Sequence, residues 1–351
     1  MEPQDRRATE GSGPAASVIL TAHDRRPFLR DAVESVRAQT ADRSAYELVV
    51  VKNFLDTEID SFLDRAGAQR VLCEDRPVSR KVLEGLRACR GNVVLLLDDD
   101  DLFEPQKIRT VLGEFAARPD LGFYHNQVSY VGADGGPIDP KRSRFLALRP
   151  TGRARRLLLS NDEKTRGLAR LAYSYPDFNC SSIAIRRDVA LASSPYLERI
   201  DGGVDTFFFF VALTQPCSLF FDDAALTRYR VHEENASLAV GSRPETRRAR
   251  LLEAARRQDH VNRVTREMVL RSGSPYALRE LEARSLIDRL SIIFRDRESR
   301  RLDAVRTLLK GLRLTDTFAV RENVPSMAGA LLFAVAPPLA RVAYEYQTAI
   351  R

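Results

Sequence analysis

In the first hundred residues, short apolar runs alternate with segments whose apolar residues have helical spacing. This alternation restricts the possible fold more than any other feature of the chain. Strands are predicted over Ser17–Thr21, Tyr46–Val51, Arg70–Cys73 and Val93–Leu97. The first and the last of these are expected to be buried. Helices are predicted between them, over Pro27–Ala38, Ile59–Arg65 and Ser79–Cys89. Strands that alternate with helices build a mostly parallel sheet with helices on both faces, so a Rossmann-like α/β fold is expected.

The rest of the chain is predicted to be mixed and then entirely helical. The mixed part is expected to hold a strand pair over Gly122–Val131, a basic irregular stretch over Lys141–Arg156, a helix over Asn161–Tyr173, a strand over Ser181–Arg186, a helix over Asp205–Leu213 and a strand around Leu219–Phe221. Three helices are expected after it, over Pro244–Gly273, Tyr276–Arg295 and Arg301–Leu312. The chain is therefore expected to carry an α-helical C-terminal appendage.

Composition sets broad limits on the function. The chain has 351 residues, is 44% hydrophobic and has a formal net charge of +7. The basic balance permits phosphorylated substrates, anionic membranes or nucleic acid as partners, but no nucleic-acid-binding motif accompanies it. The four cysteines are widely spaced, which predicts reduced thiols and a cytoplasmic protein. No apolar stretch reaches the length of a membrane-spanning helix.

Four consecutive carboxylates, Asp98 to Asp101, follow the apolar run Val93–Leu97 directly. Ligands of open α/β sheets bind beyond the carboxyl ends of the strands, where these side chains are expected. Alternate residues of an extended segment face the same way, so Asp98 and Asp100 are predicted to reach one site. Carboxylate oxygens suit hard cations, and the cluster therefore predicts a Mn²⁺ or Mg²⁺ site. Part of the cluster has a structural alternative, since Asp101 or Glu104 could cap the next helix.

Four segments match motifs of one known family. Residues 17–25 read SVILTAHDR, where the opening strand of that family reads like SVIIPTYNR. Residues 47–54 read ELVVVKNF, where its second strand reads like EIIVVDDGS. Asp98–Asp101 match its metal-binding DxD, and Tyr229–Ser237 match its YRxHxxNxS stretch. Over about residues 16–237, the chain therefore resembles the family 2 glycosyltransferases of the GT-A fold.

The resemblance implies a domain plan and an activity. Residues 1–15 are expected to form a disordered tail, 16–130 the nucleotide-sugar-binding half of a GT-A domain, 131–240 its acceptor-binding half, and 241–351 a helical C-terminal region. The implied reaction is metal-dependent, inverting transfer of a sugar from a nucleotide-diphosphate donor, by default a UDP-sugar. The acceptor would be a hydroxyl of a glycan, a lipid-linked glycan or another molecule.

The same resemblance assigns site residues. It implies that Asp98, Asp100 and His232 bind the metal and that Asp205 is the catalytic base, with Asp201 as the second candidate. Asp205 has a structural alternative as the cap of the helix that follows it. Donor binding is assigned to Thr21, His23, Asp24, Arg25, Asn53, Lys81 and Asp99. Further positive charge for the diphosphate is expected from Arg80, Lys81 or Arg230.

Two departures from the family pattern leave the nucleotide open. Lys52 and Asn53 replace the usual Asp pair after the second strand, and Lys81-Val82-Leu83 replaces an Ala-Arg-Asn. Asn53 can still bond a base edge, while Lys52 is expected to reach a phosphate or to face solvent. GDP-sugars and dTDP-sugars therefore stay open as donors.

Other functions also stay open at this point. The departures from the family pattern are compatible with a catalytically degenerate binding module. A DxD phosphatase of the haloacid dehalogenase type is disfavoured, because Leu102 stands where that family has Thr or Val.

The basic, amphipathic C-terminal helices have two interpretations. They are expected either to pack on the catalytic domain or on a second subunit, as in a homodimer, or to lie at the inner face of a membrane.

Overall fold

The computed structural model describes residues 13–24, 27–139, 156–164, 176–232, 235, 244–296, 298–315, 317, 320, 324–340 and 342. Several predictions fall wholly or mainly outside these residues: Arg25, the tail over residues 1–15, the basic stretch Lys141–Arg156 and the helix over Asn161–Tyr173.

The first half of the chain forms the predicted parallel sheet. Its strands are β1 (Ala16–Ala22), β2 (Tyr46–Lys52), β3 (Gln69–Leu72) and β4 (Val93–Asp98), in the spatial order β3-β2-β1-β4. The helices between and after them are α1 (Leu29–Arg37), α2 (Thr57–Arg65), α3 (Val78–Ala88) and α4 (Lys107–Ala117). Every residue of β1 and β2 is buried, as expected for strands covered by helices on both faces. The α/β fold expected from the sequence is confirmed.

The second half continues the same sheet with mixed directions. The added strands are β5 (Leu102–Phe103), β6 (Leu121–Val131), β7 (Leu157–Leu159), β8 (Ile183–Arg186) and β9 (Ser218–Arg230). From β4 the order runs β4-β8-β6-β9-β5, with β7 paired to β9. The neighbours β6 and β9 run parallel, whereas β8 is antiparallel to both β4 and β6. The described strands thus form one nine-stranded sheet that crosses the predicted boundary at residue 130, and the division into two functional halves stays a prediction.

One strand prediction in this half is wrong, and another gave a strand that is too short. The strand pair expected over Gly122–Val131 is one continuous strand, β6. Its pairing with β9 shifts register around Gln127, so the strand is irregular there but does not turn back. The strand expected around Leu219–Phe221 continues to Arg230. The longer strand brings the chain to His232, which lies beside the four aspartates at residues 98–101. We call these four residues the acidic turn.

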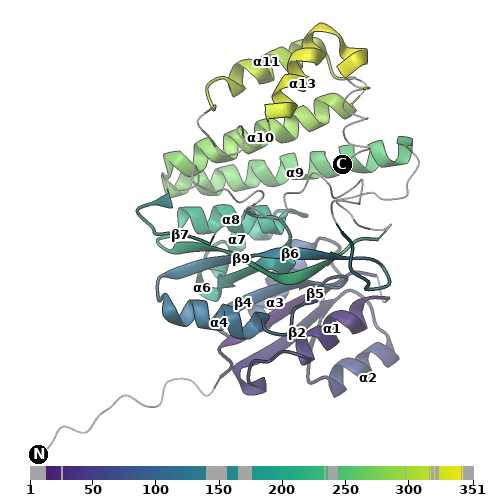
Figure 1. The fold of residues 1–351 in the computed structure, drawn as a ribbon, viewed down its shortest axis with the longest axis vertical. Coiled ribbons are helices and arrows are strands. Elements are labelled where there is room, and N and C mark those ends of the chain that lie inside the picture. The colour runs from purple at the N-terminus through teal and green to yellow at the C-terminus, as the bar shows by residue number, and fades with distance from the viewer. Residues whose placement is uncertain are drawn as a thin grey trace, which may run out of the picture.

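Helix α8 (Val204–Thr214) is buried between the sheet and the C-terminal helices (Figure 1). Its four consecutive phenylalanines, Phe207–Phe210, are at most 1% exposed. They share one hydrophobic core with Phe123 of β6 on one side and Val261 of the next helix on the other. A helix that is apolar all round is expected in such a position.

The C-terminal region is helical, as predicted. It contains α9 (Pro244–Ser272), α10 (Pro275–Arg295), α11 (Arg301–Gly311) and α13 (Val324–Val335). Figure 1 shows α9 lying across α8, with α10 and then α11 and α13 stacked beyond it. Side chains of α9 and of the start of α10 enter the main core, whereas the rest of α10 forms a second core with α11 and α13 around Phe294 and Phe333. Within the described residues, no helix has the length and apolar character needed to cross a membrane.

Candidate active site

The carboxyl ends of β1 and β4 lie side by side and open onto a cleft of about 750 Å³. Parallel strands end at the same edge of a sheet, so Thr21 is the register partner of Asp98. Seven residues predicted for the site line this cleft: Thr21, His23, Lys81, Asp98, Asp99, Asp100 and Asp205. The structure therefore brings these seven residues together in one cleft, and their roles stay predictions.

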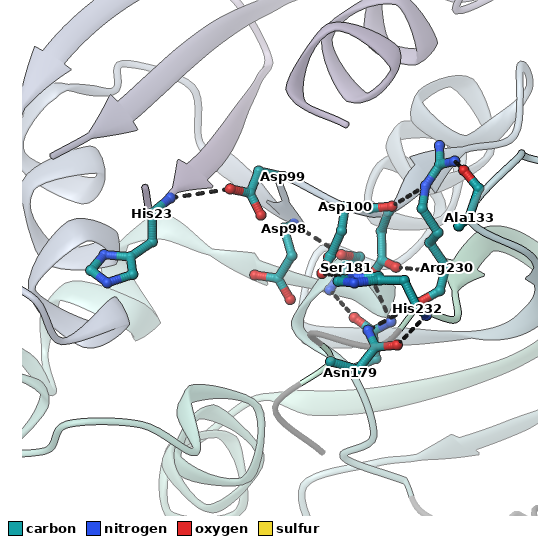
Figure 2. Close-up of polar contacts among 11 residues, drawn as sticks. His23, Asp98, Asp99, Asp100, Ala133, Asn179, Ser181, Arg230 and His232 are labelled. Atoms are coloured by element: carbon teal, nitrogen blue, oxygen red, sulfur yellow. Dashed lines mark hydrogen bonds and ion pairs between the residues drawn. The ribbon is translucent and has the colours of Figure 1, made fainter. Parts of the chain in front are cut away.

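The acidic turn after β4 spreads its side chains in different directions. Asp99 accepts a hydrogen bond from the backbone N–H of His23 at 3.1 Å, while Asp100 reaches the imidazole of His232. Figure 2 shows these two contacts on opposite sides of Asp98. The backbone N–H of Asp98 donates to Ser181 Oγ at 3.0 Å, and Thr21 Oγ1 lies 3.4 Å from Asp98 Oδ1. Neighbouring strand ends thus hold the turn open toward the cleft.

His232 lies against Asp100, as the motif predicted. Its Nε2 is 3.0 Å from Asp100 Oδ2, and the imidazole is buried beside the ring of Phe28, with ring centroids 5.0 Å apart. Asn235 fixes the segment, because its Oδ1 accepts from the His232 N–H at 2.6 Å and its Nδ2 donates to the Arg230 carbonyl at 3.1 Å. The short stretch after β9 is therefore folded to present this imidazole to the acidic turn.

Asp101 is directed away from the cleft into the protein. It accepts from the Arg230 backbone N–H at 3.0 Å and from Asn179 Nδ2 at 2.8 Å. Burial, and then the neighbouring Asp100, raise the pKa of Asp101 to about 7. The alternative that Asp101 or Glu104 caps the next helix is wrong, because the N-cap of α4 is Gln106, whose side chain makes no capping hydrogen bond. Asp101 anchors the turn to β9 instead.

Two of the three cations predicted to bind the diphosphate, Arg230 and Arg80, form contacts with other protein groups instead. The Arg230 guanidinium is 1% exposed, donates to the Asp100 carbonyl at 2.8 Å and to Asp31 at 3.0 Å, and stacks over Phe28. Arg80 lies 2.5 Å from Glu198 at the surface. Arg230 therefore braces the acidic turn from behind, which corrects the expectation that it faces a ligand.

The position of the Lys52 side chain also differs from the expectation. Its ammonium group is 2.7 Å from Asp60 Oδ1, and the residue is 2% exposed. It neither reaches a phosphate in the cleft nor faces solvent. Since a buried ammonium group needs a carboxylate partner, Asp60 of α2 decides its direction.

Lys81 and His23 form the wall of the cleft beside Asp99. Lys81 is 1% exposed, and its Nζ is 3.1 Å from His23 Nδ1 and donates to the Asp75 carbonyl at 2.8 Å. Burial lowers the pKa of Lys81. Its ammonium group is positioned by backbone oxygens, as a preorganised cation at an anion site requires.

Asp24 and Asn53 support the same wall from outside the cleft. Asp24 has a φ of 55°, in the left-handed region that Asp tolerates better than most residues. Its backbone N–H donates to Asn53 Oδ1 at 3.0 Å, and Asn53 Nδ2 donates to Asp24 Oδ1 at 2.8 Å. The two predicted donor-binding residues are thus paired with each other.

Asp205 faces the acidic turn from the other side of the cleft, in the first turn of α8. It accepts from the backbone N–H groups of Asn179, at 3.2 Å, and Thr206, at 2.9 Å. Burial, and then the charge of Asp177, raise the pKa of Asp205 to about 6. The alternative that Asp205 caps α8 is wrong, because Gly203 with a φ of 58° is the N-cap. The reserve candidate Asp201 also lines the cleft but is exposed.

Sequence reasoning missed the contribution of α9 to the cleft. Arg257 and Gln258 of this helix line it, more than fifty residues after Asp205 in the chain. A Cβ atom at Gly203 would lie 2.6 Å from Gln258 Oε1, so the start of α8 lies close to α9, and the φ of 58° at Gly203 favours glycine there. The Gly202-Gly203 pair was the available signal, since it indicates close packing next to a candidate base.

The carboxylates of the cleft are of the chemical type that binds a divalent metal, but they do not form a complete set of ligands. Within the described residues, no three His, Cys, Asp or Glu side chains are grouped to hold a metal ion. Burial and the surrounding carboxylates, first Asp100, raise the pKa of Asp98 strongly, which marks a site with excess negative charge. Mg²⁺ in nucleotide sites is usually held by one or two carboxylates together with substrate phosphates. Asp98 and Asp100 fit that form of binding.

Comparison with known proteins agrees with the geometry. Residues 17–191, about half of the chain, match the sequence model of the family described as "Glycosyl transferase family 2". A search of curated proteins finds no match.

The fold is shown by one solved structure, the first of those that follow. The mannosyltransferase PcManGT from Pyrobaculum calidifontis, in complex with GDP-Man and Mn²⁺, has a TM-score of 0.53 at 14% identity, over 96% of this chain and 84% of that chain. TarS 1-349 from S. aureus, in complex with UDP-GlcNAc, has a TM-score of 0.49 at 12% identity, over 91% of this chain and 90% of that chain. The chain spans 55% of a longer TarS chain. It belongs to glycosyl transferase family 2, and it is a glycosyltransferase with the GT-A fold.

Proposed function

We propose that the chain is a metal-dependent, inverting glycosyltransferase that uses a nucleotide-diphosphate sugar. One observation carries the proposal: a single cleft at the strand ends has Asp98 and Asp100 on one side and Asp205, with a pKa near 6, on the other. Sugar transfer needs the groups on both sides of the cleft. The departing diphosphate is anionic and needs the metal site, and the attacking hydroxyl must lose a proton and needs the base.

Asp98 and Asp100 would hold Mn²⁺ or Mg²⁺ together with diphosphate oxygens of the donor. When bound there, the metal neutralises negative charge on the departing diphosphate. His232 keeps the Asp100 carboxylate in place through the 3.0 Å contact and is available as a further ligand. Lys81 supplies a fixed positive charge from the wall of the same cleft.

Asp205 would accept the proton of the acceptor hydroxyl. A pKa of about 6 leaves the carboxylate mostly ionised at neutral pH, while making it a stronger base than an ordinary aspartate. Two backbone N–H groups hold the carboxylate oxygens in place. Direct attack on the anomeric carbon, assisted by one base, inverts that centre.

The donor is by default a UDP-sugar, with GDP- and dTDP-sugars as the alternatives, and the acceptor is a glycan or lipid-linked hydroxyl. The four cysteines Cys73, Cys89, Cys180 and Cys217 are free thiols, which supports a reducing, cytoplasmic location.

The experiment is nucleotide release from UDP-, GDP- and dTDP-sugars, with Mn²⁺ or with EDTA. The proposal predicts release from one nucleotide class, dependent on the metal and lost in Asp98→Asn. Asp188→Asn is the matched control, because Asp188 is exposed and lies outside the cleft. Binding of a donor without any release would instead identify a degenerate binding module.

A further inference from the structure

The outer surface of α11 and α13 exposes an unusual concentration of aliphatic side chains. Thirteen large aliphatic side chains of the described residues are exposed, and nine of them lie between Leu302 and Val342. Figure 1 shows α11 and α13 as the outermost layer, beyond α10 on the side away from the sheet. We call this surface, together with the exposed residues that follow α11 and α13, the outer face. Its apolar members are Leu302, Val305, Leu309, Leu312, Leu331, Leu332, Val335, Leu339 and Val342.

Helix α11 and the two residues after it combine aliphatic and cationic groups on this face. The aliphatic positions 302, 305, 309 and 312 follow helical spacing, and exposed cations accompany them at Arg301, Arg306, Lys310 and Arg313. The helix has one acid, Asp303, which is half-buried and accepts from the Arg300 backbone N–H at 3.0 Å. In the described part of the chain, none of these four cations has an ion-pair partner. The positive charge is therefore available to a partner.

Helix α13 has no polar side at all. Its inner side is already packed, because Phe333 is fully buried with its ring centroid 5.9 Å from that of Phe294 in α10. Its outer side still exposes Leu331 to 62% and Val335 to 71%. Residues 324–340 contain no charged side chain. A helix that is apolar on both sides needs a cover on the second side as well.

We propose that the outer face is a docking surface for an anionic membrane. A helix face with aliphatic side chains flanked by Lys and Arg is suited to the interface of a bilayer, where the apolar groups enter the acyl boundary and the cations meet anionic headgroups. A second copy of the chain fits less well. A two-fold contact would place the cations of one α11 against those of the other, with no exposed acid on that helix to neutralise them.

This docking mode does not depend on the chemistry of the cleft. The apolar groups give affinity without selectivity between lipids, and the cations give selectivity for negative lipids. Each cation near an anionic surface strengthens binding roughly fivefold at low salt. Binding is therefore expected to fall as the salt concentration rises.

The test is flotation of the full chain with vesicles of phosphatidylcholine alone or with roughly 30% phosphatidylglycerol, which makes the vesicle surface negative. The full chain is expected to float with the anionic vesicles and at least roughly tenfold less with neutral ones. Leu309→Gln with Leu312→Gln should abolish flotation, and Arg306→Gln with Lys310→Gln should remove the preference for anionic vesicles. Leu55→Gln is the matched control, because Leu55 is 74% exposed but lies far away in the sequence, before α2.

All substituted side chains are exposed, so the variants are expected to fold, which thermal unfolding followed by circular dichroism confirms. The proposal is overturned if the full chain floats with neither vesicle type, or equally with both. It is also overturned if sedimentation shows a dimer that the Leu309/Leu312 variant dissolves while vesicles bind neither protein. In that case the outer face pairs two copies of the chain.

Discussion

Asp205→Asn is expected to make the protein more stable and nearly inactive at neutral pH. The carboxyl group has an ordinary pKa of 3.8 and a folded-state pKa of about 6, because it is buried and faces Asp177. A pKa raised in the folded state means that folding favours the protonated acid. Stability is therefore lost as the pH rises from about 4 to about 6, where both states become ionised.

The size of the effect follows from the two pKa values. Since one pKa unit corresponds to about 1.4 kcal/mol, the ionised Asp205 costs the fold about 3 kcal/mol above pH 7. Asparagine removes this charge but keeps one acceptor oxygen, so it gives up one of the two hydrogen bonds, from Asn179 or Thr206, worth about 1 kcal/mol. The variant should be about 2 kcal/mol more stable at pH 7.5 and about equal to the original chain near pH 4.5.

The assay is urea unfolding at several pH values, together with sugar transfer. Turnover in Asp205→Asn should fall by about 10²- to 10⁴-fold, and transfer by the original chain should rise with pH through about pH 6. Asp201→Asn is the matched control, because this acid lines the same cleft but is exposed. The reasoning is refuted if Asp205→Asn is less stable at pH 7.5, or if it keeps the original turnover.

Two further variants test how the site is supported. Arg284→Met removes the α10 cation that contacts Asp177 at 2.8 Å, so the free energy of unfolding should fall by about 3 kcal/mol, and the pH midpoint for transfer should rise because Asp177 then repels Asp205 without compensation. An unchanged midpoint in the pH profile would contradict this coupling. Gly85→Ala places a Cβ atom 2.4 Å from Ile19 Cγ2, so α3 must shift against β1 at a cost of about 1–3 kcal/mol in urea unfolding. Gly113→Ala, where no atom lies within 4 Å of the new Cβ, is its control and should not destabilise the fold.

The parallel half of the fold was predictable because its signals are local. Each of β1, β2 and β4 contains a short unbroken apolar run, and runs of this length between turn signals favour buried strands. The acidic turn was predictable for the same reason, since carboxylates at the carboxyl end of β4 and directly after it have to lie at the edge of the sheet. The mixed half was harder, because the length of β9 depends on its pairing with β6, almost a hundred residues away in the sequence.

The errors at the site arise from tertiary contacts. Nothing near Lys52 in the sequence indicates that Asp60 will bind its ammonium group inside the protein. The role of Arg230 depends on Asp31 and on the Asp100 carbonyl, both more than a hundred residues away. Helix α9 enters the cleft only because the Phe-rich α8 positions it there, so no local pattern could assign Arg257 to the site.

Calorimetric titration with nucleoside diphosphates tests the central claim most directly. The claim is that Asp98 and Asp100 bind a donor diphosphate through a divalent cation at the edge of the sheet. In Mn²⁺, one of UDP, GDP and dTDP should bind the chain, and binding should weaken at least roughly tenfold in EDTA and in Asp98→Asn, as expected when a metal bridges carboxylates and phosphates. Equal affinity of that nucleotide in Mn²⁺, in EDTA and for the Asp98→Asn variant would contradict the account.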